Sequence, residues 1–136
     1  IGVDIEEIRL PAEWERIAER FFTPDERAVI RTAGGGDRAG SFIRIWTRKE
    51  AVVKGIGKGL RLPLHLIDAA GEAGRSGRRV RFEAPADREG GWSVHDLEEF
   101  DGFASAVAIE YRGDVSFVER TFSLPFFGKN AGREDT

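Results

Sequence analysis

The hydrophobic pattern changes its period along this 136-residue chain, and that change limits the folds open to it. From about residue 11 to residue 56, apolar side chains recur every three or four positions, which is typical of amphipathic helices. From about residue 78 to residue 111 they alternate, which is typical of strands. The pattern predicts an α+β fold in which helices pack on one side of a small antiparallel sheet.

The strand pattern is clear at the start of the chain. The segment IGVDIEEI (1–8) alternates as a half-buried strand does, so Asp4 and Glu6 share its polar face, and Val3 and Ile5 lie on the other face. Three further strands are predicted, at 78–84, 91–100 and 103–111. The last is apolar on both faces and is therefore expected to be central in its sheet.

Three helices are predicted between the first strand and the others. The first covers about 11–22. The second begins with Thr23 as its N-cap, and Glu26 completes a capping box. The third covers about 41–54 and is ended by glycines.

One position in the third predicted helix interrupts its apolar stripe. Lys49 lies in the middle of that stripe, which is formed by Phe42, Ile45, Val52, Val53 and Ile56. A lysine there requires a charged partner or a route to solvent. Of only four lysines in the chain, three lie within ten residues of each other, namely Lys49, Lys54 and Lys58. The cluster indicates either a phosphate-binding site or a solvated helix face.

The acidic residues offer candidate metal ligands. Asp4 and Glu6 are two positions apart on a strand, so their carboxylates emerge roughly 7 Å apart and can approach one hard cation. Glu50 supplies a third carboxylate if the long helix packs against that strand, which makes an octahedral Mg²⁺ site plausible. The alternatives are an exposed acidic edge strand and, for Glu50 and Lys54, an ordinary surface pair one helical turn apart.

The composition argues against several classes of function. The net charge of −3 does not indicate a nucleic-acid partner, and no segment approaches the roughly 18 apolar residues of a membrane-spanning helix. There is no cysteine, so we expect no disulfide, thiolate metal site or cysteine nucleophile, and we expect a cytoplasmic location. The chain contains no methionine, even at its start, so we expect further sequence upstream of Ile1.

Three segments, GVDIE (2–6), FFTPDE (21–26) and WTRKEAVVKGIGKGL (46–60), occur in this order. Together they resemble the signature segments of the 4′-phosphopantetheinyl transferases, and in particular the carboxyl-terminal half of the two-domain, surfactin-synthetase-activating type. The resemblance covers residues 1–112, which we expect to form the transferase domain. Residues 113–136 are expected to form a poorly specified tail.

The resemblance implies roles for particular residues. Asp4, Glu6 and Glu50 match the carboxylates that bind Mg²⁺ together with the pyrophosphate of coenzyme A. Lys54 matches a residue that contacts phosphate and assists transfer, and Lys49 matches a further phosphate contact, so Lys49 is expected to point into a charged cleft. Glu26 matches an acidic residue near the metal, and either Glu50 or Glu26 is the implied general base. His65 and His95 lie outside the motifs and are expected at the surface or in hairpins.

The implied reaction transfers 4′-phosphopantetheine from coenzyme A to a serine of an acyl or peptidyl carrier protein and releases 3′,5′-ADP. The family's residues for adenine and the 3′-phosphate are absent from this chain, so an amino-terminal half or a neighbouring subunit is expected to complete the site. Contact with that part is expected through apolar side chains, with Phe42, Trp46 or the Phe21–Phe22 pair as candidates. Two alternatives remain: a non-catalytic module that binds carrier proteins, and an unrelated Mg²⁺-dependent phosphohydrolase.

Overall fold

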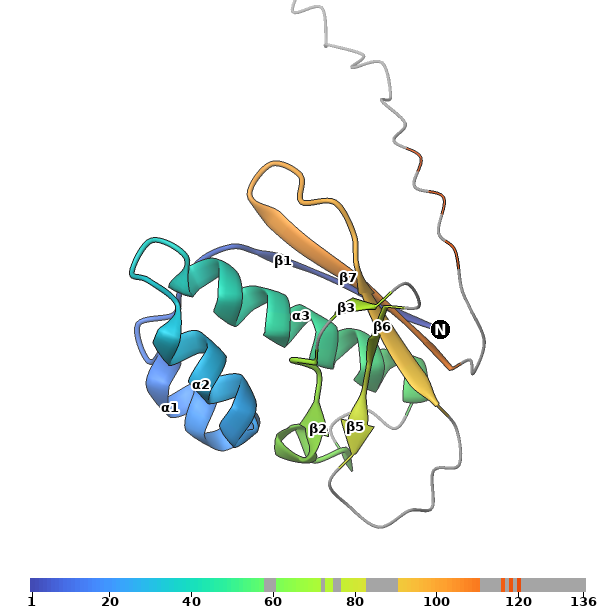
Figure 1. Cartoon of the computed structure of the whole chain (residues 1–136), viewed down its shortest axis with the longest axis horizontal. Coiled ribbons are helices and arrows are strands. Elements are labelled where there is room, and N and C mark those ends of the chain that lie inside the picture. The colour runs from blue at the N-terminus through green and yellow to red at the C-terminus, as the bar shows by residue number, and fades with distance from the viewer. Residues whose placement is uncertain are drawn as a thin grey trace, which may run out of the picture.

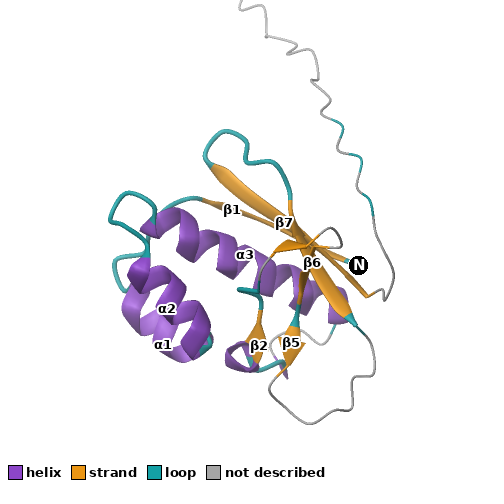
Figure 2. Cartoon of the chain, in the orientation of Figure 1, coloured by secondary structure: helices purple, strands orange, loops and turns teal. Residues whose placement is uncertain are grey.

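The structure, a computed structural model, describes residues 1–57, 61–71, 73–74, 77–82 and 91–110 and the single positions 116, 118 and 120. One long helix, α3 (Arg38–Ile56), crosses one face of an antiparallel sheet, and two shorter helices lie beside its amino-terminal part (Figure 1). These are α1 (Trp14–Phe21) and α2 (Pro24–Thr32). Helices and strands therefore form separate layers, as the pattern predicts (Figure 2).

The sheet has five strands in the order β1-β7-β6-β4-β3. The bounds of these strands are β1 (Gly2–Glu7), β3 (Ala73–Gly74), β4 (Gly77–Arg79), β6 (Trp92–Asp96) and β7 (Phe103–Glu110). The first strand pairs along its length with the last, so that Asp4 is opposite Ala106 and Glu6 is opposite Ala104. Because β7 has a partner on each side, its predicted central position is confirmed.

A second, two-stranded sheet joins β2 (Ile67–Asp68) to β5 (Arg81–Phe82). The sequence predicts one strand over 78–84, but the described part of that segment divides between the two sheets. The division falls at Val80, whose side chain is buried in the core while its backbone N–H donates to the carbonyl of Trp92. The predicted strand is thus interrupted at Val80, where the pairing partner changes from β6 to β2.

The helix termini follow the sequence signals closely. Thr23 accepts a hydrogen bond from the backbone of Glu26 and Glu26 accepts one from the backbone of Thr23, so the predicted capping box at the start of α2 is confirmed. The third helix begins earlier than predicted, at Arg38, and ends at Ile56, with Gly57 as a left-handed C-cap at φ 73°. The prediction that glycine ends the helix is confirmed, and the glycine that does so is Gly57.

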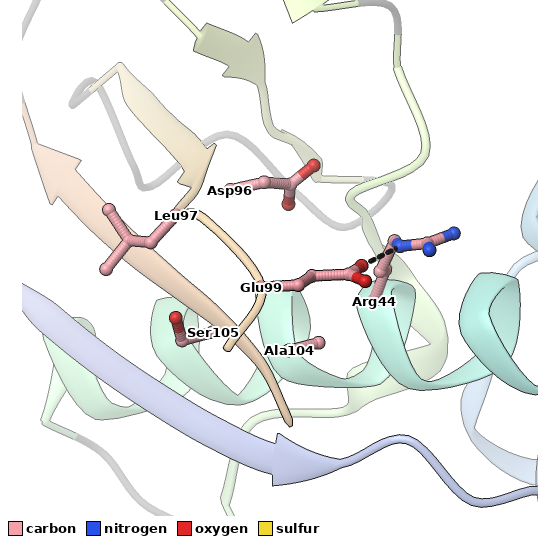
Figure 3. Close-up of a pocket in the computed structure, with 6 residues that line it drawn as sticks. All are labelled: Arg44, Asp96, Leu97, Glu99, Ala104 and Ser105. Carbon is pink, nitrogen blue, oxygen red and sulfur yellow. Dashed lines mark hydrogen bonds and ion pairs between the residues drawn. The ribbon is translucent and has the colours of Figure 1, made fainter. Parts of the chain in front are cut away.

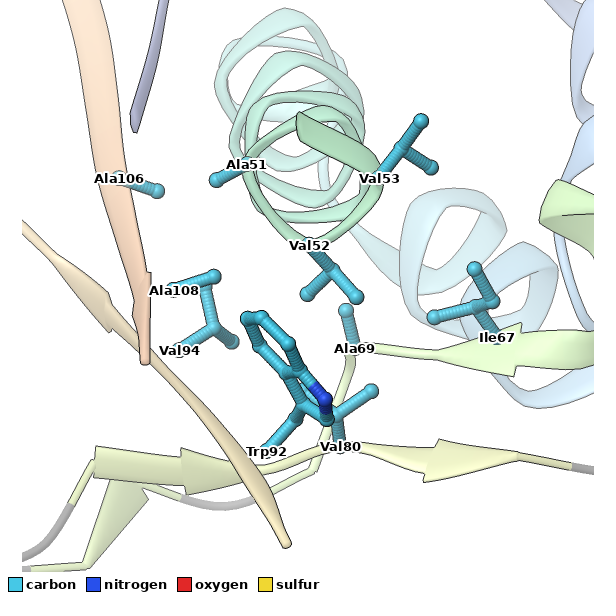
Figure 4. Packing of buried hydrophobic residues seen from close by; sticks show 10 residues of the cluster. All are labelled: Ala51, Val52, Val53, Ile67, Ala69, Val80, Trp92, Val94, Ala106 and Ala108. Atoms are coloured by element: carbon cyan, nitrogen blue, oxygen red, sulfur yellow. The ribbon is translucent and has the colours of Figure 1, made fainter. Parts of the chain in front are cut away.

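The main core lies between α3 and the sheet. Trp92 is its largest member, and Figure 4 shows its indole among Val52, Val94 and Ala108, below the end of α3. The alanines of β7 face α3 and leave space for this helix to lie close to the strand. No helix in the described part of the chain has the length and apolar character needed to cross a membrane.

A second core packs α1 and α2 against the amino-terminal half of α3. It contains the stacked rings of Phe22 and Phe42, whose centroids are 4.9 Å apart. Both rings are at most 2% exposed, so the prediction that they form an apolar docking surface is wrong. Phe21 and Trp46 are partly buried and pack edge to face against each other.

Several predictions lie outside the described residues. They concern Lys58, the end of the strand predicted at 78–84 and, apart from three positions, the tail at 113–136. The proposed boundary near residue 112 therefore stays a prediction.

Candidate active site

Asp4 lies on the face of β1 that packs against α3. Its side chain is 5% exposed, and its Oδ1 accepts a hydrogen bond of 2.5 Å from Nζ of Lys54. Its Oδ2 is buried and has no hydrogen-bond partner among the described residues. A buried carboxylate oxygen without a partner bears the cost of its lost hydration, so this atom is suited to a cation or a further donor.

The predicted alternation of β1 is confirmed, but its two faces are reversed. The carboxylate of Asp4 points inward, while Val3 and Ile5 are 53% and 64% exposed. The reason is the position of α3, which covers the acidic face of the strand and brings Lys54 to it. The apolar side chains are therefore left on the outer face of the sheet.

Glu6 and Glu50 lie close enough to Asp4 for the three charges to influence one another. Burial raises the pKa of Glu6, and the negative charge of Asp4 raises it further, while Lys54 opposes both effects. Burial likewise raises the pKa of Glu50, with added contributions from Asp4 and Glu6. Both carboxyl groups thus lie in an environment that disfavours their negative charge and favours a nearby cation.

Lys54 is the cation that faces this acidic group. Its hydrogen bond to Asp4 raises its pKa, and the negative charges of Asp4, Glu50 and Glu6 raise it further. Partial burial lowers the pKa but does not outweigh these effects. Its side chain is 52% exposed, so the ammonium can also reach solvent or a bound ligand. Lys54 is therefore a charged group at the edge of the acidic cluster.

Residues of the predicted metal site do come near one another, but they do not enclose an ion by themselves. Among the described residues, no group of three or more His, Cys, Asp or Glu side chains is arranged to hold a metal ion. The buried, unpaired Oδ2 of Asp4 nevertheless fits a cation ligand. The shared Mg²⁺ site of Asp4, Glu6 and Glu50 stays a prediction.

A pocket of about 330 Å³ opens beside Glu50. Its walls are largely apolar and come from α1, α3 and the segment before β2, with Phe21, Val53, Leu62 and Leu64 among them. Arg20 and His65 add polar groups. Apolar walls next to one acidic side chain suit an organic ligand whose reactive end is charged.

The sequence profile of the 4′-phosphopantetheinyl transferase superfamily matches residues 1–108. This chain belongs to that superfamily. The 4′-phosphopantetheinyl transferase HetI of Nostoc sp. is 33% identical over 109 residues, which are 80% of this chain and 43% of HetI. The match thus spans less than half the length of this relative.

Two solved structures share the fold. The holo-[acyl-carrier-protein] synthase of Neisseria meningitidis gives a TM-score of 0.65 at 21% identity, covering 82% of this chain and 96% of the synthase. The synthase of Helicobacter pylori, solved in complex with coenzyme A, gives 0.60 at 21% identity, covering 79% and 96%. The predicted α+β architecture of a phosphopantetheinyl transferase is confirmed.

The other two site residues that the transferase resemblance implies, Glu26 and Lys49, lie together in the interior. Both side chains are fully buried, and Lys49 Nζ donates to Glu26 Oε2 at 2.6 Å. Lys49 therefore has the charged partner that its position in the apolar stripe requires, but in this structure it does not open into a cleft. Its phosphate contact, and the place of Glu26 near the metal, stay predictions that require this pair to open.

A smaller pocket of about 70 Å³ lies near the other end of α3. Figure 3 shows Arg44 of α3 reaching the carboxylate of Glu99 there, with Asp96, Leu97 and Ser105 around them. Its volume is that of a few water molecules, so it does not compete with the larger pocket as a transferase site.

Sequence reasoning missed the residues that form the walls of the pocket beside Glu50. His65 was expected at the surface, and it is indeed exposed, but it also lines this pocket with Arg20. Neither residue belongs to a transferase signature segment, and the chain brings them together only through the packing of α1 against the segment before β2. No signal in the sequence identifies them.

Proposed function

We propose that this chain forms the metal- and phosphate-binding part of a 4′-phosphopantetheinyl transferase, which moves 4′-phosphopantetheine from coenzyme A to a serine of an acyl or peptidyl carrier protein. The observation that carries the proposal is the buried carboxylate of Asp4, whose Oδ1 is bound to Lys54 and whose Oδ2 has no partner in the part of the chain that the structure describes. Membership of the superfamily supports this reading of the site.

The carboxylates of Asp4, Glu6 and Glu50 would hold Mg²⁺, which would also bind phosphate oxygens of coenzyme A. Three carboxylates facing one ammonium leave two negative charges in excess, which a divalent cation balances. Bound Mg²⁺ would stabilise the charge that develops on the pyrophosphate during transfer.

The chain's own residues have distinct roles in the proposed reaction. The serine Oγ bonds to the β-phosphorus of coenzyme A, the bond from that phosphorus to the bridging oxygen breaks, and 3′,5′-ADP leaves. Glu50 accepts the serine proton, directly or through water, because its carboxylate lines the pocket that would receive the substrate. Lys54 neutralises charge on the phosphates, since its half-exposed ammonium reaches the edge of the site.

The pocket beside Glu50 would receive the pantetheine arm. That arm is uncharged and flexible, and the walls formed by Phe21, Val53 and Leu62 are apolar. The phosphate end of the arm would then lie next to Glu50.

An amino-terminal half or a neighbouring subunit would complete the site for the adenine and the 3′-phosphate. Of these two we favour an additional half, because HetI is more than twice as long as the region that it shares with this chain. That half would cover the outer face of β1 and β7, where Val3, Ile5 and Phe103 are 53%, 64% and 40% exposed. The reaction would take place in the cytoplasm.

The test is a transfer assay with coenzyme A and apo carrier proteins, followed by the mass of the carrier protein. We expect a mass increase of one phosphopantetheinyl group that depends on Mg²⁺ and is abolished by chelation. Glu50→Gln should remove most of the activity, whereas Glu7→Gln, which changes an exposed carboxylate at the end of β1, should not. Carrier-protein binding without transfer would instead indicate a docking module, and release of inorganic phosphate would indicate a phosphohydrolase.

The contribution of the missing part is tested by comparing three preparations. We expect residues 1–136 alone to give little transfer, and addition of the upstream half, in cis or in trans, to restore it. Full activity from a monomer of this chain would refute the two-half arrangement. Activity that elutes with a trimer would favour a site shared between subunits.

A further inference from the structure

The buried pair of Glu26 and Lys49 is saturated with partners from its own chain. Glu26 Oε2 accepts from Lys49 Nζ at 2.6 Å and from the backbone of Thr23 at 2.9 Å, and Oε1 accepts from the backbone of Ala69 at 2.8 Å. Lys49 Nζ also donates to the carbonyl of Ile67 at 2.5 Å and lies 5.6 Å from the ring centroid of Phe22. No part of either charged group faces solvent.

These contacts join three elements that are separate in the sequence. The carboxylate lies in the first turn of α2, and the ammonium comes from the middle of α3. The two backbone partners are Ile67, which begins β2, and Ala69, which directly follows it. Hydrogen bonds to a charged group are directional, so the pair fixes both the rotation of α3 about its axis and the position of β2.

The rotation of α3 and the position of β2 both affect the pocket beside Glu50. Glu50 follows Lys49 directly on α3, so the rotation that buries Lys49 also determines where Glu50 points. The opposite wall contains Leu62 and Leu64, in the segment that leads into β2. The same buried pair thus holds both sides of the pocket.

We infer that Glu26 and Lys49 are positioning residues, which hold Glu50 and the Leu62–Leu64 wall at a fixed separation and do not touch the substrate. This inference rests on the proposed function, because it concerns the geometry of that site. It differs from the roles that the sequence resemblance implies, in which both residues reach the metal or the phosphates. Direct contact would require a fully buried pair to separate and leave one charge uncompensated in the core.

The test is a double-mutant cycle of Glu26→Gln, Lys49→Met and the double variant, in the preparation that gives transfer. Because the two residues act as one unit, each single variant and the double variant should lower kcat by the same factor, about 10-fold, when compared at equal folded fraction. KM for coenzyme A should stay within about threefold of its original value in all three variants. As a matched control, Arg44→Met, which breaks the half-exposed pair with Glu99 away from the pocket, should leave kcat unchanged.

Two kinetic outcomes would overturn the inference. A large rise in KM for coenzyme A in Lys49→Met, with none in Glu26→Gln, would mean that Lys49 binds phosphate directly. Unchanged kcat in all three variants, with a loss of stability only, would mean that the pair is a structural contact without effect on the site. If Lys49→Met does not fold, Glu26→Gln carries the test, since its amide keeps the size of the side chain.

Hydrogen exchange separates this inference from the proposed function. The Leu66 amide donates to the carbonyl of Pro63 and the Ala69 amide donates to Glu26, so both report on the wall and its attachment. We expect faster exchange at these amides in both single variants without any substrate present, and unchanged exchange there would contradict the positioning role. If the unaltered protein shows no transfer, the proposed function fails, while this measurement still decides whether the pair holds the wall.

Discussion

Nζ of Lys54 lies 2.5 Å from Oδ1 of Asp4, although the two residues are 50 positions apart. The contact joins the last turns of α3 to the first strand and places a mobile cation against the acidic cluster. One lysine cannot fully neutralise three carboxylates, and no other described residue provides a hydrogen-bond partner for Oδ2 of Asp4. The site around this contact therefore favours an additional positive charge.

Replacing Lys54 with alanine should lower kcat by about 100-fold, because removal of one preorganised group that stabilises transition-state charge has an effect of that size. Affinity for coenzyme A should fall much less, since the charge acts mainly in the transition state. The measurements are transfer kinetics and calorimetry with coenzyme A, with Arg31→Ala on the exposed face of α2 as the control. Unchanged turnover with weaker coenzyme A binding would assign Lys54 to substrate binding alone.

Alanine at Asp4, Glu6 or Glu50 should each lower turnover by about 100-fold or more, because changes at residues that only support metal ligands already lower activity 10- to 100-fold. Mn²⁺ affinity, measured by calorimetry, should fall in parallel and provides a reading that does not depend on transfer. Glu7→Ala is the matched control, since Glu7 ends the same strand with an exposed side chain. Near-normal activity of all three variants in the full-length protein would refute the metal assignment.

Gly2→Ala should destabilise the fold by about 1–3 kcal/mol, as overpacking of a close contact does. A Cβ at Gly2 would lie 2.0 Å from the carbonyl oxygen of Ala51 and 2.3 Å from the backbone N of Gly55, so β1 and α3 would have to separate. Urea unfolding measures the change. Gly35→Ala, whose Cβ would meet nothing within 4 Å, should leave the midpoint almost unchanged. Equal effects of the two substitutions would contradict the close approach of β1 and α3.

Asp96 should make the fold sensitive to acid. Burial alone would raise its pKa, but the hydrogen bonds and charges of Arg48 and Arg78 outweigh burial and lower the pKa from the ordinary 3.8. A carboxyl group whose pKa is lower in the folded state stabilises the fold above its unfolded pKa, and this contribution is lost as the pH falls through the lower, folded value. The stabilisation should therefore be complete at neutral pH, should begin to fall near pH 4, and should be lost as the pH passes the lower pKa of the folded state.

The measurement is the difference in urea midpoint between the original protein and Asp96→Asn as a function of pH, because other titrating groups cancel in the difference. The variant should be less stable at neutral pH, and the difference should shrink as the pH falls below about 4. A difference that stays constant across this range would show that the pair with Arg48 does not shift the ionisation of Asp96.

Much of the fold is determined by local sequence. The capping box of Thr23 and Glu26, the glycine that ends α3 and the alternation of β7 each depend on neighbouring residues only, and the structure confirms all three. Glu50 lies near Asp4 and Glu6 because α3 packs on β1, and the predicted metal site depends on this packing.

Tertiary structure decided the features that depend on partners distant in the sequence. Alternation in β1 has the same period whichever face is buried, so only the packing of α3 shows that Asp4 points inward and Ile5 outward. Lys49 pairs with Glu26, 23 positions away, because folding brings α2 beside α3 and excludes solvent from both charged groups. The period of the sequence pattern indicates which residues share a face of a helix or strand. Whether a charged side chain on that face is buried depends on which other elements pack against it.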